Sequence, residues 1–100
     1  MQVKWLRRAL RNLDQEAAHI AQDNRRAAAE LIAQANQVTR LLAMHPGLGR
    51  PGRIPGTREI VLAGFPYLIP YRVKDKCVET LRVFHTSRKW PPGFDDCGDT

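Results

Sequence analysis

Two helical segments follow one another in the first half of the chain with only a few residues between them. The first apolar stripe, within residues 7–22, comprises Leu10, Leu13, Ala17 and Ile20, with Leu6 and Ala9 beside it. The second, within residues 25–44, comprises Ala28, Leu31, Ala35, Val38 and Leu42, widened by Ile32 and Leu41. Both have the spacing of an amphipathic helix. Asp23 and Asn24 interrupt the pattern, and either can cap the second helix. A connection this short predicts an antiparallel helical hairpin, whose stripes require a sheet to lie on.

The second half of the chain changes from helical to strand periodicity. Pro46 ends the second helix, because proline disfavours the α conformation of the residue before it. Residues 46–57 hold four glycines and three prolines, which predicts a loop. Strands are predicted over residues 58–62, 67–73 and 78–85, and the short turns between them force antiparallel pairing. Near the N-terminus, residues 2–6 alternate in polarity, which predicts a first strand.

The predicted element order is therefore β-α-α-β-β-β. We expect an α+β fold in which the helical hairpin packs on one face of a small antiparallel sheet and leaves the other face free. Pro70 falls inside a predicted strand, where it cannot donate a hydrogen bond, which indicates an edge or bulged position. With 100 residues, we expect one domain over residues 1–100, with a tail that frays from about residue 92.

Composition limits the classes of function. The net charge of +6 favours an acidic partner, either nucleic acid or an acidic protein segment. No apolar run approaches the roughly 20 residues that span a bilayer, and the N-terminus lacks the apolar core of a signal peptide. We therefore expect a cytoplasmic protein without a membrane partner. Cys77 and Cys97 lack CxxC spacing, and we interpret them as reduced thiols.

No cofactor or metal is expected from the pattern of possible ligands. His19, His45 and His85 lie in different predicted elements without ligand spacing. Phosphate-binding and hydrolase motifs such as the P-loop, GxGxxG, HExxH and GxSxG are missing. Arginines and lysines crowd the second half, interleaved with Tyr67, Tyr71 and Trp90. That mixture suits nucleic-acid binding, and it equally suits a solvated face with aromatic core residues.

The stretch LRVFHTSRKWP at residues 81–91 contains the strongest candidate for chemistry, His85. On the predicted last strand, one face holds Leu81, Val83 and His85, and the other holds Arg82 and Phe84. A histidine at the end of an apolar face is most often half-buried, with one satisfied nitrogen. The alternative is a proton shuttle in RNA cleavage, beside Arg82, Arg88 or Lys89 as a cation that stabilises a phosphorane.

Several of these stretches together resemble one protein family. LGRPGRIPGTREIVL, YLIPYRV and LRVFHTSRKWP make residues 48–91 similar to the RelE/ParE family of bacterial type II toxins. VKWLRRALRNLDQEAAHIAQDN and the alanine-rich segment after it extend the resemblance to residues 2–91. The resemblance implies a helical hairpin on an antiparallel sheet. It also implies a toxin that forms a hetero-oligomer with, and is neutralised by, a cognate antitoxin encoded beside it.

The resemblance covers two activities. RelE-type members cut mRNA in the ribosome with basic residues and often a terminal tyrosine or histidine, whereas ParE-type members inhibit DNA gyrase. The ribonuclease branch typically has an arginine in a stretch like YRLVY, where this chain has YLIPY with Leu68 in that place. Leucine cannot bind a scissile phosphate, and a lost electrostatic donor costs about 3 kcal/mol or more of transition-state stabilisation.

We therefore expect a toxin that inhibits gyrase by protein–protein contact and is not an enzyme. The alternative is a ribosome-dependent mRNA endoribonuclease, in which His85 is the acid or base and the phosphate clamps are Arg58, Arg82 and Arg88. A third hypothesis is that the protein is a binding module that has lost its toxicity. Candidate contact residues for the antitoxin or the target are Trp5, Arg58, Tyr71, Arg82 and Trp90.

Overall fold

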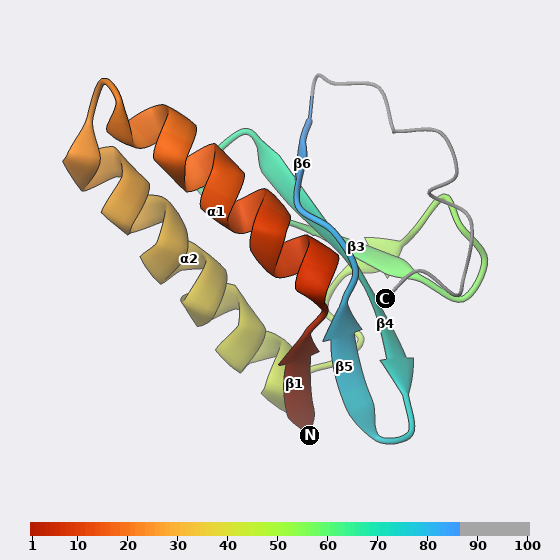
Figure 1. Cartoon of the computed structure of the whole chain (residues 1–100). Helices are drawn as coiled ribbons and strands as arrows, with labels where there is room; N and C mark the ends of the chain where they lie inside the picture. Colours follow the sequence, from red (N-terminus) through yellow and green to blue (C-terminus); the bar gives the residue numbers. More distant parts are fainter. Residues whose placement is uncertain (87–100) are drawn as a thin grey trace.

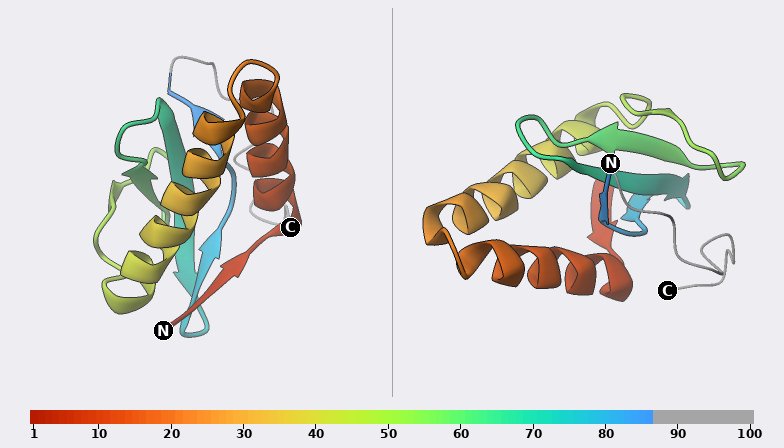
Figure 2. Two further views of the ribbon diagram at one scale, coloured as in Figure 1. Left: turned by 90° about the vertical axis from the view of Figure 1, so that its left-hand side faces the viewer. Right: turned by 90° about the horizontal axis from the view of Figure 1, so that it is seen from above.

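A pair of helices lies on one face of a twisted sheet in the computed structural model, which describes residues 1–86 (Figures 1 and 2). The elements are β1 (Gln2–Trp5), α1 (Arg7–Ala21), α2 (Arg25–Met44), β2 (Arg50–Pro51), β3 (Arg58–Val61), β4 (Tyr67–Lys74), β5 (Cys77–Thr80) and β6 (Phe84–His85). The predicted α+β fold with its helical hairpin is confirmed. The predicted tail, together with Arg88, Lys89, Trp90 and Cys97, lies outside the described residues.

The sheet has the strand order β1-β5-β4-β3-β2, with β6 paired to β4 beyond the end of β5. The pairs β3–β4 and β4–β5 are antiparallel, as the short turns predicted. β1 instead pairs with β5 in parallel, with Val3 opposite Val78, so the sheet is mixed. No tight turn constrains the direction of β1, because the whole hairpin separates it from the later strands. The two-residue β2 was not predicted, because its sequence is an arginine and a proline between glycines.

The predicted strand over residues 78–85 is split into β5 and β6 by a bulge. Tyr71 lies opposite Thr80 and Leu68 lies opposite Phe84, so residues 81–83 face the shorter stretch 69–70. The carbonyl of Pro70 accepts a hydrogen bond from the Leu81 N–H at this bulge. The ring nitrogen of Pro70 therefore faces the irregular segment, where no ladder donor is needed. The predicted bulge is confirmed, but β4 is an interior strand, so the edge position was wrong.

The core lies between the hairpin and the sheet. Its buried members include Leu13 and Ala17 from α1, Leu31, Ala35 and Leu42 from α2, and Tyr67, Ile69 and Tyr71 from β4. All of the principal stripe predicted for α2 is buried. Leu10, Ile32 and Leu41 were also predicted to be buried, but they are 45%, 38% and 40% exposed. They lie at the margins of their stripes, because each helix contacts its neighbours over a narrower arc than the pattern suggested.

The hairpin turn confirms one specific prediction. Asn24 caps α2, since its side chain accepts a hydrogen bond from the Ala27 N–H at 3.0 Å. On the opposite side of the sheet, the predicted free face is only partly open. Leu68 and Pro70 point away from the hairpin side of β4, and both are buried.

Candidate functional site

Tyr71 and Arg58 tie the segment that follows α2 to the middle of the sheet. The Tyr71 ring is fully buried, and its hydroxyl donates to the Pro46 carbonyl at 2.7 Å and accepts from the Gly49 N–H at 2.8 Å. Arg58 lies opposite Tyr71 in β3, and its Nη1 donates to the Gly49 carbonyl at 2.8 Å. A Cβ at Gly49 would lie 2.7 Å from the Tyr71 ring, so the loop can approach this closely only as glycine. Both candidate residues therefore have a structural role.

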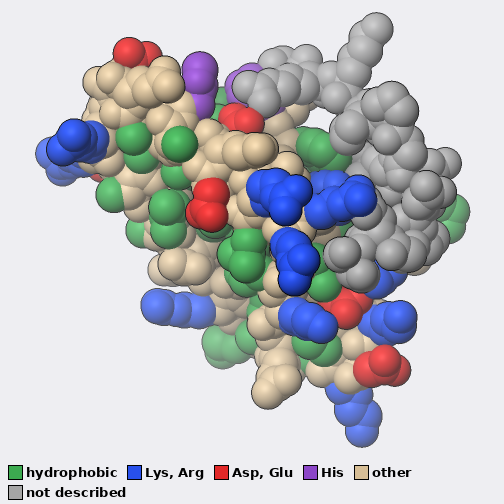
Figure 3. Space-filling view, viewed as in Figure 1, with side chains coloured by type: hydrophobic (Ala, Val, Ile, Leu, Met, Phe, Trp, Pro, Cys, Tyr) green, Lys and Arg blue, Asp and Glu red, His purple; other side chains and the backbone are tan. Residues whose placement is uncertain are grey.

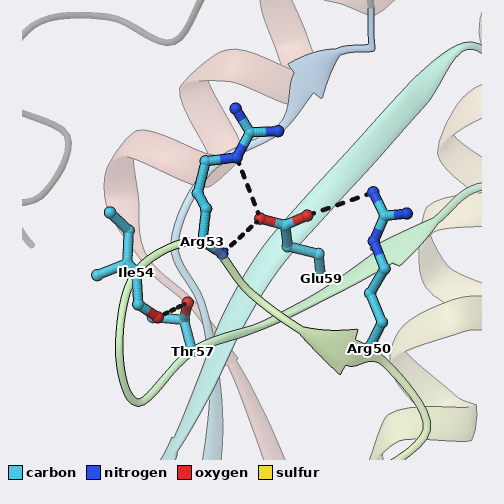
Figure 4. Close-up of polar contacts among 5 residues, drawn as sticks. All are labelled: Arg50, Arg53, Ile54, Thr57 and Glu59. Atoms are coloured by element: carbon cyan, nitrogen blue, oxygen red, sulfur yellow. Dashed lines mark hydrogen bonds and ion pairs between the residues drawn. The ribbon is translucent and has the colours of Figure 1, made fainter.

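A buried carboxylate organises the next loop. Glu59 in β3 is 4% exposed, and its Oε2 accepts from the backbone N–H of Arg53 at 3.2 Å (Figure 4). The same carboxylate forms ion pairs with the guanidinium groups of Arg53 at 3.6 Å and Arg50 at 3.4 Å. Thr57 closes the loop by donating its hydroxyl proton to the Ile54 carbonyl at 2.6 Å. Sequence reasoning missed Glu59, because a single acidic residue near several arginines matches no motif.

We expect Glu59→Gln to lower the free energy of unfolding by about 1–2 kcal/mol, because two charge-assisted contacts and part of a backbone hydrogen bond are lost. The loss is limited because both arginine partners are more than half exposed and return to water. Chemical denaturation measures it. The matched control is Glu30→Gln, which removes an exposed ion pair to Arg26 and should cost less than about 0.5 kcal/mol. Equal losses in the two variants would contradict the role assigned to Glu59.

His85 is held in an aromatic contact at the other end of β4. It lies in β6 opposite Tyr67, and the two rings meet edge to face with centroids 5.4 Å apart. The Tyr67 hydroxyl donates to Oε1 of Glu16 on α1 at 2.9 Å. His85 is half-buried. This is the packing expected if His85 is a structural residue with one satisfied nitrogen, the alternative to a proton shuttle. Its chemical role stays a prediction.

Arg82 is buried at the bulge between β5 and β6. It is 6% exposed, and its Nη1 donates to the Leu81 carbonyl at 2.8 Å. Burial, and then the nearby charge of Arg8, lower the pKa of the Arg82 guanidinium from its usual value, although an arginine remains protonated at neutral pH. Val83 beside it is also buried, and its N–H donates to Oδ1 of Asn12 on α1. The bulge interrupts the strand predicted through residues 81–83, but Val83 lies in the core and His85 lies opposite Tyr67 of the same core, so these two residues share a face as predicted.

Within residues 1–86, the candidate catalytic residues Arg58 and His85 do not lie around one point. Arg58 is registered with Tyr71 and His85 with Tyr67, so the two positions are offset along β4 by about 13 Å at roughly 3.3 Å per residue. They also lie on strands at opposite sides of β4. Leu68, where the resemblance implies an arginine in the ribonuclease branch, is buried between Val61 and Phe84. The structure thus places Arg58 apart from His85, and Arg88 lies outside the described residues.

The candidate contact residues are also placed differently from one another. Trp5 is partly buried and packs against the core, whereas Tyr71 and Arg82 are buried. Arg58 is exposed, and Trp90 lies outside the described residues. Within residues 1–86, no three His, Cys, Asp or Glu side chains gather where they could hold a metal ion. In the same part of the chain, no helix is long and apolar enough to cross a membrane.

Comparison with known proteins decides the family. The model of the ParE toxin of the parDE type II toxin–antitoxin system matches residues 3–90, which is most of the chain. The chain belongs to this ParE toxin family. A putative toxin, Y4kP of Sinorhizobium fredii, is 47% identical over 89 residues, which cover 89% of this chain and 92% of the relative. The resemblance identified from the sequence is thereby confirmed.

The ParE fold is confirmed by a solved structure as well. The chromosomal ParDE toxin–antitoxin system from P. aeruginosa contains a chain that superimposes with a TM-score of 0.78 at 29% sequence identity. The match covers 87% of this chain and 97% of that chain. This ParE-family toxin therefore shares both its architecture and its recognisable sequence with a toxin–antitoxin system.

Proposed function

We propose that this ParE-family toxin inhibits DNA gyrase through protein–protein contact, without cleaving RNA. The observation that carries the proposal is the separation of Arg58 from His85, two of the residues that a nuclease would need. Arg58 binds loop carbonyls near the middle of the sheet, while His85 packs on Tyr67 about 13 Å further along β4. A phosphorane must contact its acid, base and cationic donors within hydrogen-bond distance. The buried Leu68 adds no donor to either group.

The same proposal includes a cognate antitoxin that neutralises the toxin in a hetero-oligomer. The family description names a toxin–antitoxin system, which supports a partner of this kind. The net charge of +6 favours an antitoxin segment with acidic side chains, and such an association weakens as salt rises. Among the candidate contacts within residues 1–86, Arg58 has the exposed side chain, and we propose it as the first of them to contact a partner.

The test is expression of the toxin without an antitoxin in bacteria, followed by growth and by the topology of a reporter plasmid. We expect growth arrest with loss of negative supercoiling. The variant His85→Phe should keep both effects, because phenylalanine preserves the edge-to-face contact with Tyr67 but cannot transfer a proton. Removing a general acid or base typically costs a nuclease about 10²–10⁴ in rate. Loss of growth arrest in a folded His85→Phe variant would therefore contradict the proposal.

A further inference from the structure

A dense group of cations surrounds the start of α1. We define the basic patch as Lys4, Arg7, Arg8, Arg11 and Arg82. The first four are exposed, and Figure 3 shows lysine and arginine side chains gathered over the first turns of α1 and the adjoining strands. Arg82 contributes its charge from below the surface, next to Arg8. The patch is bounded along α1 by Asp14 and Glu16.

This placement of charge works against the stability of the helix. A helix N-terminus carries partial positive charge and favours acidic residues, but the first turn of α1 has none. Its N-cap residue is Leu6, which provides no side-chain hydrogen bond. Arg7 and Arg11 are also neighbours at i,i+4 spacing, where like charges repel. A concentration of cations that the fold itself disfavours is the electrostatic footprint of a polyanion-binding surface.

The chemistry of the patch favours phosphates over an acidic protein segment. Protein interfaces usually centre on buried apolar or aromatic anchors, whereas the basic patch exposes four cations and the large apolar side chain on α1 between Arg7 and Arg11 is Leu10 alone. Trp5, in the strand that precedes α1, packs against the core and so gives no platform for stacking unpaired bases. Duplex nucleic acid needs no such platform, because arginine and lysine contact its backbone directly.

We propose that the basic patch binds the phosphate backbone of duplex DNA. Three or so phosphate contacts would give weak, sequence-independent and strongly salt-dependent binding. This surface goes beyond gyrase inhibition and does not depend on it, since the contact with DNA is made by the toxin itself. A toxin with such a surface would be bound to DNA, and DNA is the substrate of gyrase. The toxin would therefore encounter the enzyme where the enzyme works.

The test uses purified full-length toxin and a fluorescein-labelled 20-base-pair duplex of arbitrary sequence, with fluorescence anisotropy measured from low to physiological salt. The test variant is Arg7→Gln/Arg11→Gln. The matched control is Arg25→Gln/Arg40→Gln, which removes the same charge from exposed positions of α2. The charge-preserving variant is Arg7→Lys/Arg11→Lys. Thermal unfolding followed by circular dichroism checks that all three remain folded.

We expect the test variant to bind roughly 10- to 100-fold more weakly near 0.1 M salt, with the slope of log K against log salt reduced by about 2. The control and the lysine variant should stay within a few-fold of the wild type. Three results would overturn the proposal. These are no binding at low salt, equal weakening in test and control variants, or tighter binding to single-stranded DNA or polyglutamate than to the duplex.

Discussion

We expect replacement of Tyr71 by alanine to lower the free energy of unfolding by about 3–5 kcal/mol, the range for truncating a large buried aromatic side chain. The ring is fully buried in the core beneath the hairpin. Its hydroxyl is also the point at which Pro46 and Gly49 are joined to the sheet. Truncation therefore opens a cavity and releases the segment after α2 at the same time. Urea denaturation measures the loss.

Tyr71→Phe separates these two contributions. It keeps the ring but leaves the Gly49 N–H and the Pro46 carbonyl without their partner, which costs about 1–3 kcal/mol when such groups are buried. We expect the phenylalanine variant to be clearly more stable than the alanine variant and less stable than the wild type. If Tyr71→Phe matched the wild type, the hydroxyl would not hold the loop, and the interpretation of Tyr71 as a structural anchor would be wrong.

The second large effect distinguishes two adjacent leucines of α2. Leu42 is fully buried, whereas Leu41 is 40% exposed. Leu42→Ala should cost about 2–5 kcal/mol, because the vacated volume in a packed core is not refilled. Leu41→Ala should cost less than about 1 kcal/mol, since only part of its apolar surface is removed from water in the folded state. The same chemical change on neighbouring residues makes each variant the control of the other.

Denaturant titration of the two leucine variants measures which side of α2 faces the sheet. Equal midpoints would mean that the hairpin is rotated relative to the sheet. A larger loss from Leu41→Ala than from Leu42→Ala would place Leu41 rather than Leu42 against the sheet, contrary to the principal stripe that the sequence predicts. Either result would contradict the packing described for α2.

The helices were predictable because their signals are local. The 3.6-residue period and the Asn24 cap define α2, and its predicted bounds match the observed Arg25–Met44. The width of the buried stripe was less predictable, because Leu10 and Leu41 continue the pattern without reaching the core. Periodicity indicates the direction of a buried face, whereas its breadth depends on how closely the neighbouring layers approach.

The sheet was harder to predict because its details depend on contacts distant in sequence. The parallel pairing of β1 with β5 brings together residues at opposite ends of the fold, such as Val3 and Val78. The bulge opposite Pro70 divides the last predicted strand and places Arg82 beside Val83 in the interior. A two-residue alternation cannot reveal such a bulge, although the proline itself indicated that one was needed.

The candidate site shows the same limit more strongly. Arg58 was chosen for its charge and Tyr71 for its aromatic ring, but both hold the segment after α2. Glu59, which organises the neighbouring loop, had no sequence motif to mark it. Loss of toxicity in variants of Arg58, Tyr71 or Arg82 would therefore report folding as readily as function. His85→Phe and the exposed arginines of α1 are more informative positions, because their substitution leaves the core intact.

The most direct test of gyrase inhibition by contact is a supercoiling assay with purified gyrase, relaxed plasmid and increasing amounts of purified toxin, run beside translating ribosomes that receive the same toxin. We predict that supercoiling falls as toxin is added, that the His85→Phe variant inhibits equally well, and that the mRNA on the ribosomes stays intact. Undiminished supercoiling at saturating toxin, together with cleaved mRNA, would contradict the proposed function.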